Sequence, residues 1–179
     1  MTTISRKKKV LVPLATLAAA GAIVVGSGAT FTSQTQNSAS AVTSGTLNHS
    51  NSKANAAIFN LTNMKPGDVV NGGLVLKNTG SLPAAFSLTE TTSSNEFTND
   101  YLTLVIKNNT TGAEVYNGTF GGLVDGAKKD IGQIAPDATS SFTFTVKLDQ
   151  AAPNSQQGKT ASAAYQWDSV QLSGETYNQ

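Results

Sequence analysis

The sequence predicts an all-β protein, an antiparallel jelly-roll-like β-sandwich of about eight or nine strands. Short segments in which apolar and polar residues alternate recur along most of the chain, separated by turn signals about every 8–12 residues. The composition agrees, because 39% of the residues are hydrophobic, only 13% are charged, and Thr, Ser, Asn and Gly are abundant. Alternation of this kind is typical of half-buried strands that cover one core.

The predicted strands follow in chain order. The clearest alternating segments are 57–61, 74–77, 86–89, 102–107 and 142–148. Weaker candidates are 115–116, 131–134 and 163–172. Gly72-Gly73 lies inside a strand pattern and suggests a β-bulge. The stretch 91–99 is the best place for a short helix or a long loop, since Ser93, Ser94 and Asn95 are able to cap a helix.

The first 29 residues have the pattern of a secretory signal peptide, which we expect to be helical. Four basic residues, 6–9, precede an apolar run over 10–25, and small residues follow. Ser27 and Ala29 suit positions −3 and −1 of a signal-peptidase site, which makes Thr30 the first mature residue. A retained membrane anchor is the alternative, but the run is shorter than the roughly 20 residues that span a bilayer.

The remaining chain divides into three parts by composition. Residues 30–46 are polar and uncharged, and predict an extended arm or a first strand. Residues 47–172 form the predicted sandwich, and 173–179 a polar tail. Residues 30–179 carry 8 basic and 11 acidic side chains, a net charge of −3. That balance leaves no basic patch for nucleic acid, and contact with a membrane is expected only through the signal segment before cleavage.

The sequence offers no catalytic, cofactor-binding or metal-binding constellation. There is no Cys, and the single histidine, His49, lies in a polar stretch that predicts a solvated loop side chain. A zinc site with two histidines is excluded by that inventory. The single tryptophan, Trp167, is expected to anchor the core, and a ligand-stacking platform is the sharper alternative.

The stretch 60–82 contains two turn signals with a strand between them. In the first turn, Pro66 presets φ and Gly67 allows a positive φ. In the second, Asn78 and Gly80 both tolerate left-handed conformations. We interpret these residues as a structural turn motif that fixes the register of the strand, and its members are Lys65, Pro66, Gly67, Asp68, Asn78 and Gly80.

These motifs resemble those of the TasA/camelysin family of secreted Gram-positive proteins. The matching pieces are 44–47, 59–68 and 76–82, and the signal segment is similar to those cleaved by a SipW-type signal peptidase. The resemblance implies a jelly-roll sandwich, secretion to the matrix or cell surface, and a role as a biofilm-matrix or fibre subunit. Some members are labelled metalloendopeptidases, but this sequence has no zinc-binding motif that would support such an activity.

The sequence leaves three candidate functions, and we expect no cofactor because no metal-binding or cofactor-binding motif is present. The first is a secreted structural protein, a fibre subunit or accessory that associates with itself or with other matrix proteins through sandwich edges. The arm, 30–46, then either pairs with a neighbouring subunit or folds back as the first strand of its own domain. The second is an adhesive or ligand-binding module, and the least favoured is a protease.

Overall fold

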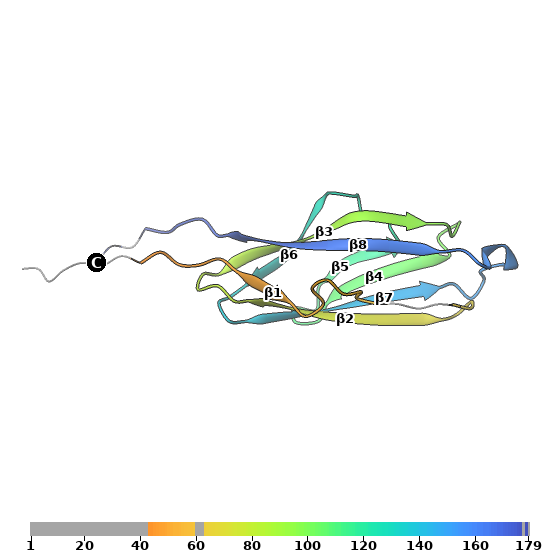
Figure 1. The fold of residues 1–179 in the computed structure, drawn as a ribbon, viewed down its shortest axis with the longest axis horizontal. Coiled ribbons are helices and arrows are strands. Elements are labelled where there is room, and N and C mark those ends of the chain that lie inside the picture. The colour runs from red at the N-terminus through yellow and green to blue at the C-terminus, as the bar shows by residue number, and fades with distance from the viewer. Residues whose placement is uncertain (1–42, 60–62, 177, 179) are drawn as a thin grey trace, which may run out of the picture. The chain divides into compact units, whose positions relative to one another are not determined.

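A computed structural model describes residues 43–59, 63–176 and 178. Within these residues the protein has eight strands and no α-helix, which confirms the all-β prediction (Figure 1). The predicted signal segment and most of the arm lie outside the described residues. The elements are β1 (His49–Asn51), β2 (Val69–Asn78), β3 (Ala84–Asn95), β4 (Leu102–Asn108), β5 (Glu114–Thr119), β6 (Lys128–Ile134), β7 (Thr139–Leu148), the short 3-10 helix η1 (Asn154–Gln156) and β8 (Ala161–Gln171).

The strands form two antiparallel sheets that pack face to face. The five-stranded sheet has the order β1-β2-β7-β4-β5, and the three-stranded sheet has the order β6-β3-β8. Every strand pair is antiparallel. Consecutive strands cross between the sheets at most connections, as in a jelly-roll-like sandwich.

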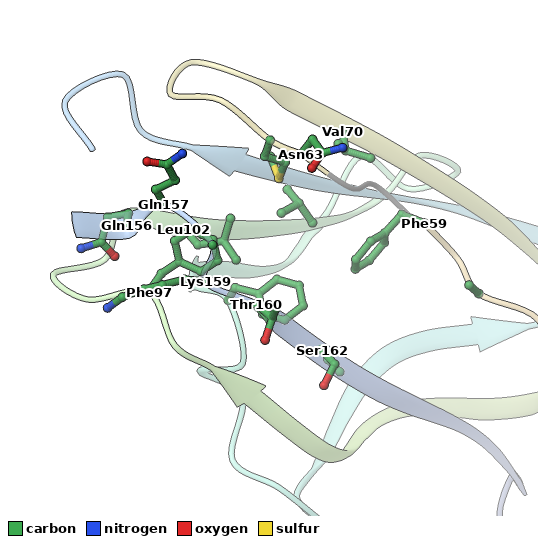
Figure 2. A pocket seen from close by; sticks show the side chains of 17 residues that line it. Phe59, Asn63, Val70, Phe97, Leu102, Gln156, Gln157, Lys159, Thr160 and Ser162 are labelled. Carbon is green, nitrogen blue, oxygen red and sulfur yellow. The ribbon is translucent and has the colours of Figure 1, made fainter. Parts of the chain in front are cut away.

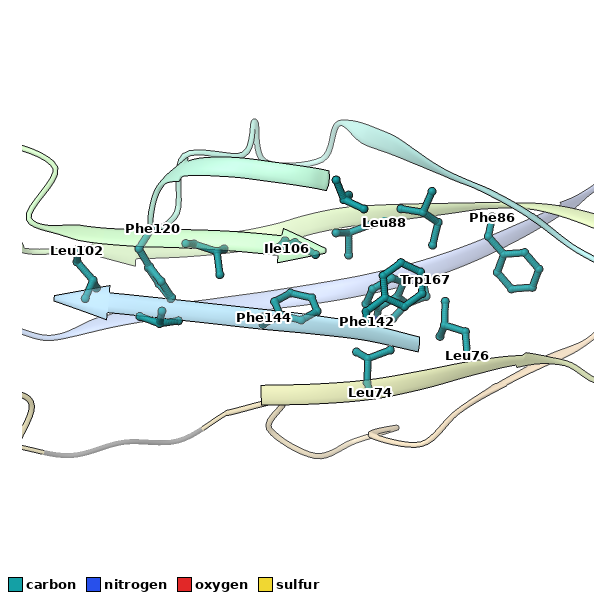
Figure 3. Packing of buried hydrophobic residues seen from close by; sticks show 14 of the residues in the cluster. Leu74, Leu76, Phe86, Leu88, Leu102, Ile106, Phe120, Phe142, Phe144 and Trp167 are labelled. Atoms are coloured by element: carbon teal, nitrogen blue, oxygen red, sulfur yellow. The ribbon is translucent and has the colours of Figure 1, made fainter. Parts of the chain in front are cut away.

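The core forms where the alternating positions of both sheets meet (Figure 3). On β7, for example, Phe142 and Phe144 are buried while the threonines between and after them are only partly buried. Trp167 is 9% exposed, and its ring centroid lies 5.2 Å from that of Phe142. The expectation that Trp167 anchors the core is therefore confirmed.

Three predictions about local structure are wrong. The predicted strand 57–61 is not a strand over its described residues, 57–59, which instead form an irregular segment against β2 at Gly72. The register of β2 with β7 runs unbroken from Val69 to Lys77, so Gly72-Gly73 forms no bulge. Strand β3 continues to Asn95 instead of ending in a helix or loop, because its polar second half pairs with Ala161–Ala164 of β8. The polar residues Thr and Ser are compatible with a strand, and here the long-range pairing overrides the capping signal.

Candidate functional site: a groove between two strand edges

Two strand edges on the same side of the sandwich have no strand partner among residues 43–59 and 63–176. Strand β8 pairs only with β3, so its other edge has no strand partner in the described part of the chain. Strand β1 covers only Leu76–Asn78 of β2, which leaves the outer edge of Val69–Leu74 without a described strand partner. Open edges present backbone N–H and C=O groups that a further strand is able to bind.

A groove lies between these two edges. Its volume is about 810 Å³, and 17 residues from both sheets and the connecting segments line it. Figure 2 looks into it, with Phe59 and Val70 on one side and Thr160 and Ser162 on the other. A second hollow of about 390 Å³ shares Ala57, Phe59 and Ala163 with the first and extends it along β8 toward Trp167.

The groove exists because of the residues at the start of β8. The partly buried positions there, Ala161 and Ala163, carry small side chains, whereas Tyr165 and Trp167 fill the core further along the strand. Across the hollow, Phe59 packs with ring centroids 6.0 Å from Phe120 and 6.4 Å from Phe144. The side chains of β8 therefore change from small to large at the point where the larger hollow ends.

The groove is almost uncharged. Lys159 is the one charged residue that lines the larger hollow, and its Nζ donates to the carbonyl of Glu96 at 2.8 Å. At the rim, Gln156 is buried and bonds Thr98 through both ends of its amide, at 3.0 and 3.1 Å. Such a surface suits an uncharged, extended peptide better than an ionic ligand.

The first predicted turn lies beside the groove, next to Met64. Asp68 donates its N–H to Lys65 at 3.0 Å, and Gly67 has the positive φ, 91°, that the turn requires. The Lys65 side chain and N–H bond the Asp68 carboxylate at 2.6 and 2.9 Å and lower its pKa. Gly67 also donates to the carbonyl of Leu148 at 2.9 Å, which fastens the turn to β7. These contacts give the turn a structural role.

Asn78 and Gly80 act by a different means from the one expected. Neither has a positive φ. Asn78 is fully buried at the end of β2, where its Nδ2 donates to the carbonyls of Leu82 and Ile134 at 2.8 and 2.9 Å. Its Oδ1 accepts the N–H of Gly80 at 3.0 Å. The predicted signal-peptidase residues Ser27, Ala29 and Thr30 lie outside the described residues.

The prediction that His49 is a solvated loop side chain is wrong. His49 lies on β1, its Nδ1 is 2.9 Å from Ser169 Oγ, and its ring meets Phe86 edge-on with centroids 5.4 Å apart. The partners are far away in the sequence, so no local signal could have revealed them. His49 thus holds β1 against β8.

The donor set does not fit a structural or catalytic zinc ion. The chain has one histidine and no cysteine, and that histidine is held by Ser169 and Phe86. Across residues 43–59 and 63–176, no three side chains of His, Cys, Asp or Glu gather into a cluster able to hold a metal ion.

One buried acidic residue was not singled out by the sequence pattern. Glu90 sits on β3 with 1% of its surface exposed, and neither carboxylate oxygen has a hydrogen-bond partner. Burial raises its pKa to about 7, with a smaller contribution from Asp125. The alternation of Phe86 and Leu88, continued by one step, places Glu90 on the inward face, and this is the sequence signal that could have found it.

Comparisons with known proteins place the chain in a family. No curated protein matches it. A family 123 glycoside hydrolase from Clostridium perfringens is similar over 61% of this chain and 19% of its own, at 14% identity and a TM-score of 0.34, which supports no argument about function. In the described residues, no helix is long and apolar enough to cross a membrane. The sequence model of the family described as camelysin metallo-endopeptidase matches residues 5–101, more than half of the 179 residues, and the chain therefore belongs to the camelysin family.

Proposed function

We propose that the protein is a secreted structural protein of the extracellular matrix or cell surface, a fibre subunit or its accessory. The observation that carries this proposal is the groove between the edges of β2 and β8, which contains few charged residues. Its occupant is the arm, residues 30–46, of a second copy of the chain. The arm contains no charged residue, and its Thr, Ser and Ala residues suit an added strand.

The positions of the arm and the groove favour a head-to-tail arrangement. Thr46 is fastened to Ser81 by hydrogen bonds of 2.8 and 3.0 Å, beyond the C-terminal end of β2. The groove lies at the other end of that strand, at Val70. The ten residues of β2 span roughly 30 Å. An arm that leaves one end and a groove that opens at the other generate a head-to-tail contact, and its repetition makes a filament where the rotation between subunits does not close into a ring.

Deletion of Thr30–Ala41 tests the proposal. We expect residues 30–179 to form filaments by negative-stain electron microscopy, and residues 42–179 to stay folded and monomeric because the donor strand is missing. Polymerisation of the shortened chain at the wild-type rate would contradict the proposal.

Variants of the groove supply the matched test. Ala163→Leu fills the hollow and should prevent it from binding the arm of another copy. Gln166→Leu, on the exposed face of β8, should leave assembly intact. The Ala163→Leu protein still has an arm, and the arm-deleted protein still has a groove. Mixed together, they should form heterodimers and nothing longer, measured by analytical ultracentrifugation; no heterodimer would count against the arm-in-groove contact.

Ligand binding is the second candidate. Phe97 and Phe120 give the groove an aromatic wall, and Gln157 adds an amide at its rim. Binding of a soluble glycan by a stable monomer on a glycan array, lost in Ala163→Leu, would favour this function over assembly.

The proposal treats the protein as having no protease activity. The family description names a metallo-endopeptidase, but the described residues provide no donor set for the metal. Cleavage of casein that a chelator abolishes would revive the enzymatic function.

A further inference from the structure

Glu90 occupies a position that an apolar residue would ordinarily fill. It follows Phe86 and Leu88 on the inward face of β3 and is buried like them. Both carboxylate oxygens are inaccessible and lack a hydrogen-bond partner among the described residues. A buried carboxylate without a partner is costly, so the neutral acid is the form that this site tolerates.

The groups around Glu90 offer no positive charge to offset its ionisation. Asp125 faces it from the loop between β5 and β6, Tyr165 from β8 and Tyr116 from β5. The Leu123 N–H lies toward the carboxyl group and partly offsets the shift, but no contact to either oxygen has hydrogen-bond geometry. Burial, followed by Asp125, raises the pKa of Glu90 to about 7.

The element that covers Glu90 is weakly attached. The loop 121–127 is held to β3 by one strong hydrogen bond, from Gly126 N–H to the Glu90 carbonyl at 2.8 Å. Ser93 Oγ adds two long contacts, 3.4 Å to the Gly121 carbonyl and 3.5 Å to Asp125. Val124 is 73% exposed, and only Leu123 packs on the core. A segment with so little buried surface belongs to the least stable part of a fold.

We propose that Glu90 is a pH-sensitive latch for the loop 121–127, which stays closed over the neutral side chain and opens when Glu90 ionises. The register of β3 with β8 shifts between Glu90 and Thr92, so the strand is already irregular next to the residue whose carbonyl accepts the Gly126 N–H. Opening admits water to the carboxylate and moves Asp125 away, while the strands on either side keep their pairing. The proposal is independent of fibre assembly.

The size of the effect follows from proton linkage. Glu90 has an ordinary pKa near 4.5 and a pKa of about 7 in the closed state. Because the closed state holds the proton more tightly, raising the pH through this window favours opening. Full solvation of Glu90 in the open state makes opening about thirtyfold more favourable at about pH 8.5 than at about pH 5.5.

Amide hydrogen exchange measured by NMR tests the latch. After correction for intrinsic exchange, protection of the Gly126 amide should fall by tenfold to about thirtyfold between these pH values. Protection of the Asn78 amide, which bonds Ala138 near the end of β6 remote from the loop, should not follow it. A ¹³C titration of the Glu90 carboxyl group should show the same midpoint.

Two variants separate the latch from other pH effects. Glu90→Gln keeps the shape of the side chain but cannot ionise, so its Gly126 protection should be independent of pH. Glu114→Gln, an exposed site on β5, should behave as the wild type. Three results would overturn the proposal: constant protection of Gly126 in the wild type, a fall in protection with pH in Glu90→Gln equal to that in the wild type, or an equal fall at Asn78. If Glu90→Gln fails to fold, the comparison of the two amides within the wild type still tests the proposal.

Discussion

Asn78 and Asn108 occupy equivalent places, each at the end of a strand and each directly after a lysine. Both are buried, and both reach from the five-stranded sheet to β6 of the other sheet, through the carbonyls of Ile134 at 2.9 Å and Ile131 at 3.4 Å. The ion pairs, in contrast, involve exposed lysines on the surface, and such pairs contribute little. The polar contacts that fix the two sheets relative to each other are therefore made by buried amide side chains, not by the surface ion pairs.

Asn78→Ala should destabilise the domain by about 2–4 kcal/mol, because it leaves the carbonyls of Leu82 and Ile134 and the Gly80 N–H without their partner and opens a small cavity. Urea unfolding followed by Trp167 fluorescence measures the change. Asn117→Ala, at an exposed amide on β5, is the control and should change stability by less than about 0.5 kcal/mol. Equal losses in both variants would show that the buried bridge has no special role.

At the scale of the element, strand β2 combines a regular register with one close contact. A Cβ at Gly72 would collide with the carbonyl of Ile58 and with the side chain of Phe59, whereas a Cβ at Gly73 would make an ordinary contact, 3.7 Å from the carbonyl of Phe142. Gly72 thus lets the segment that carries Phe59 lie directly against β2. The glycine pair that suggested a bulge instead permits two chain segments to approach.

Gly72→Ala should therefore destabilise the domain by about 1–3 kcal/mol, since the Ile58–Phe59 segment has to shift away from the core. Gly73→Ala, one position along, should be neutral or slightly stabilising. Parallel denaturant titrations give both values. If the two substitutions have the same effect, the close approach at Gly72 is not what requires glycine.

At the scale of the whole molecule, the basic and acidic residues are unevenly placed. Four of the 12 basic residues lie within 6–9, and all 11 acidic residues follow residue 29. Removal of the first 29 residues therefore changes a net charge of +1 into −3. A basic segment at the start of the chain is typical of a signal peptide, and the export that it suggests is part of the proposed function.

Mass spectrometry of the secreted protein should find Thr30 as its first residue. Ala29→Phe places a bulky side chain at position −1 and should leave an uncleaved, cell-associated precursor, because signal peptidases require a small residue there. Gly28→Ala changes position −2, which tolerates many residues, and this variant should be processed normally. A mature chain that begins elsewhere would contradict the predicted site.

The sequence by itself determined the fold class, the inward face of most strands and the turn at Lys65–Asp68, because these depend on period-2 alternation and on local backbone preferences. The motifs in the sequence also indicated the family. Only the tertiary structure decided which edges stay open, and that the small side chains of Ala161 and Ala163 leave a groove facing β2. It likewise decided that His49 meets Ser169 and that Glu90 is buried beside Tyr165. These features depend on contacts between residues distant in the chain, which no local pattern encodes.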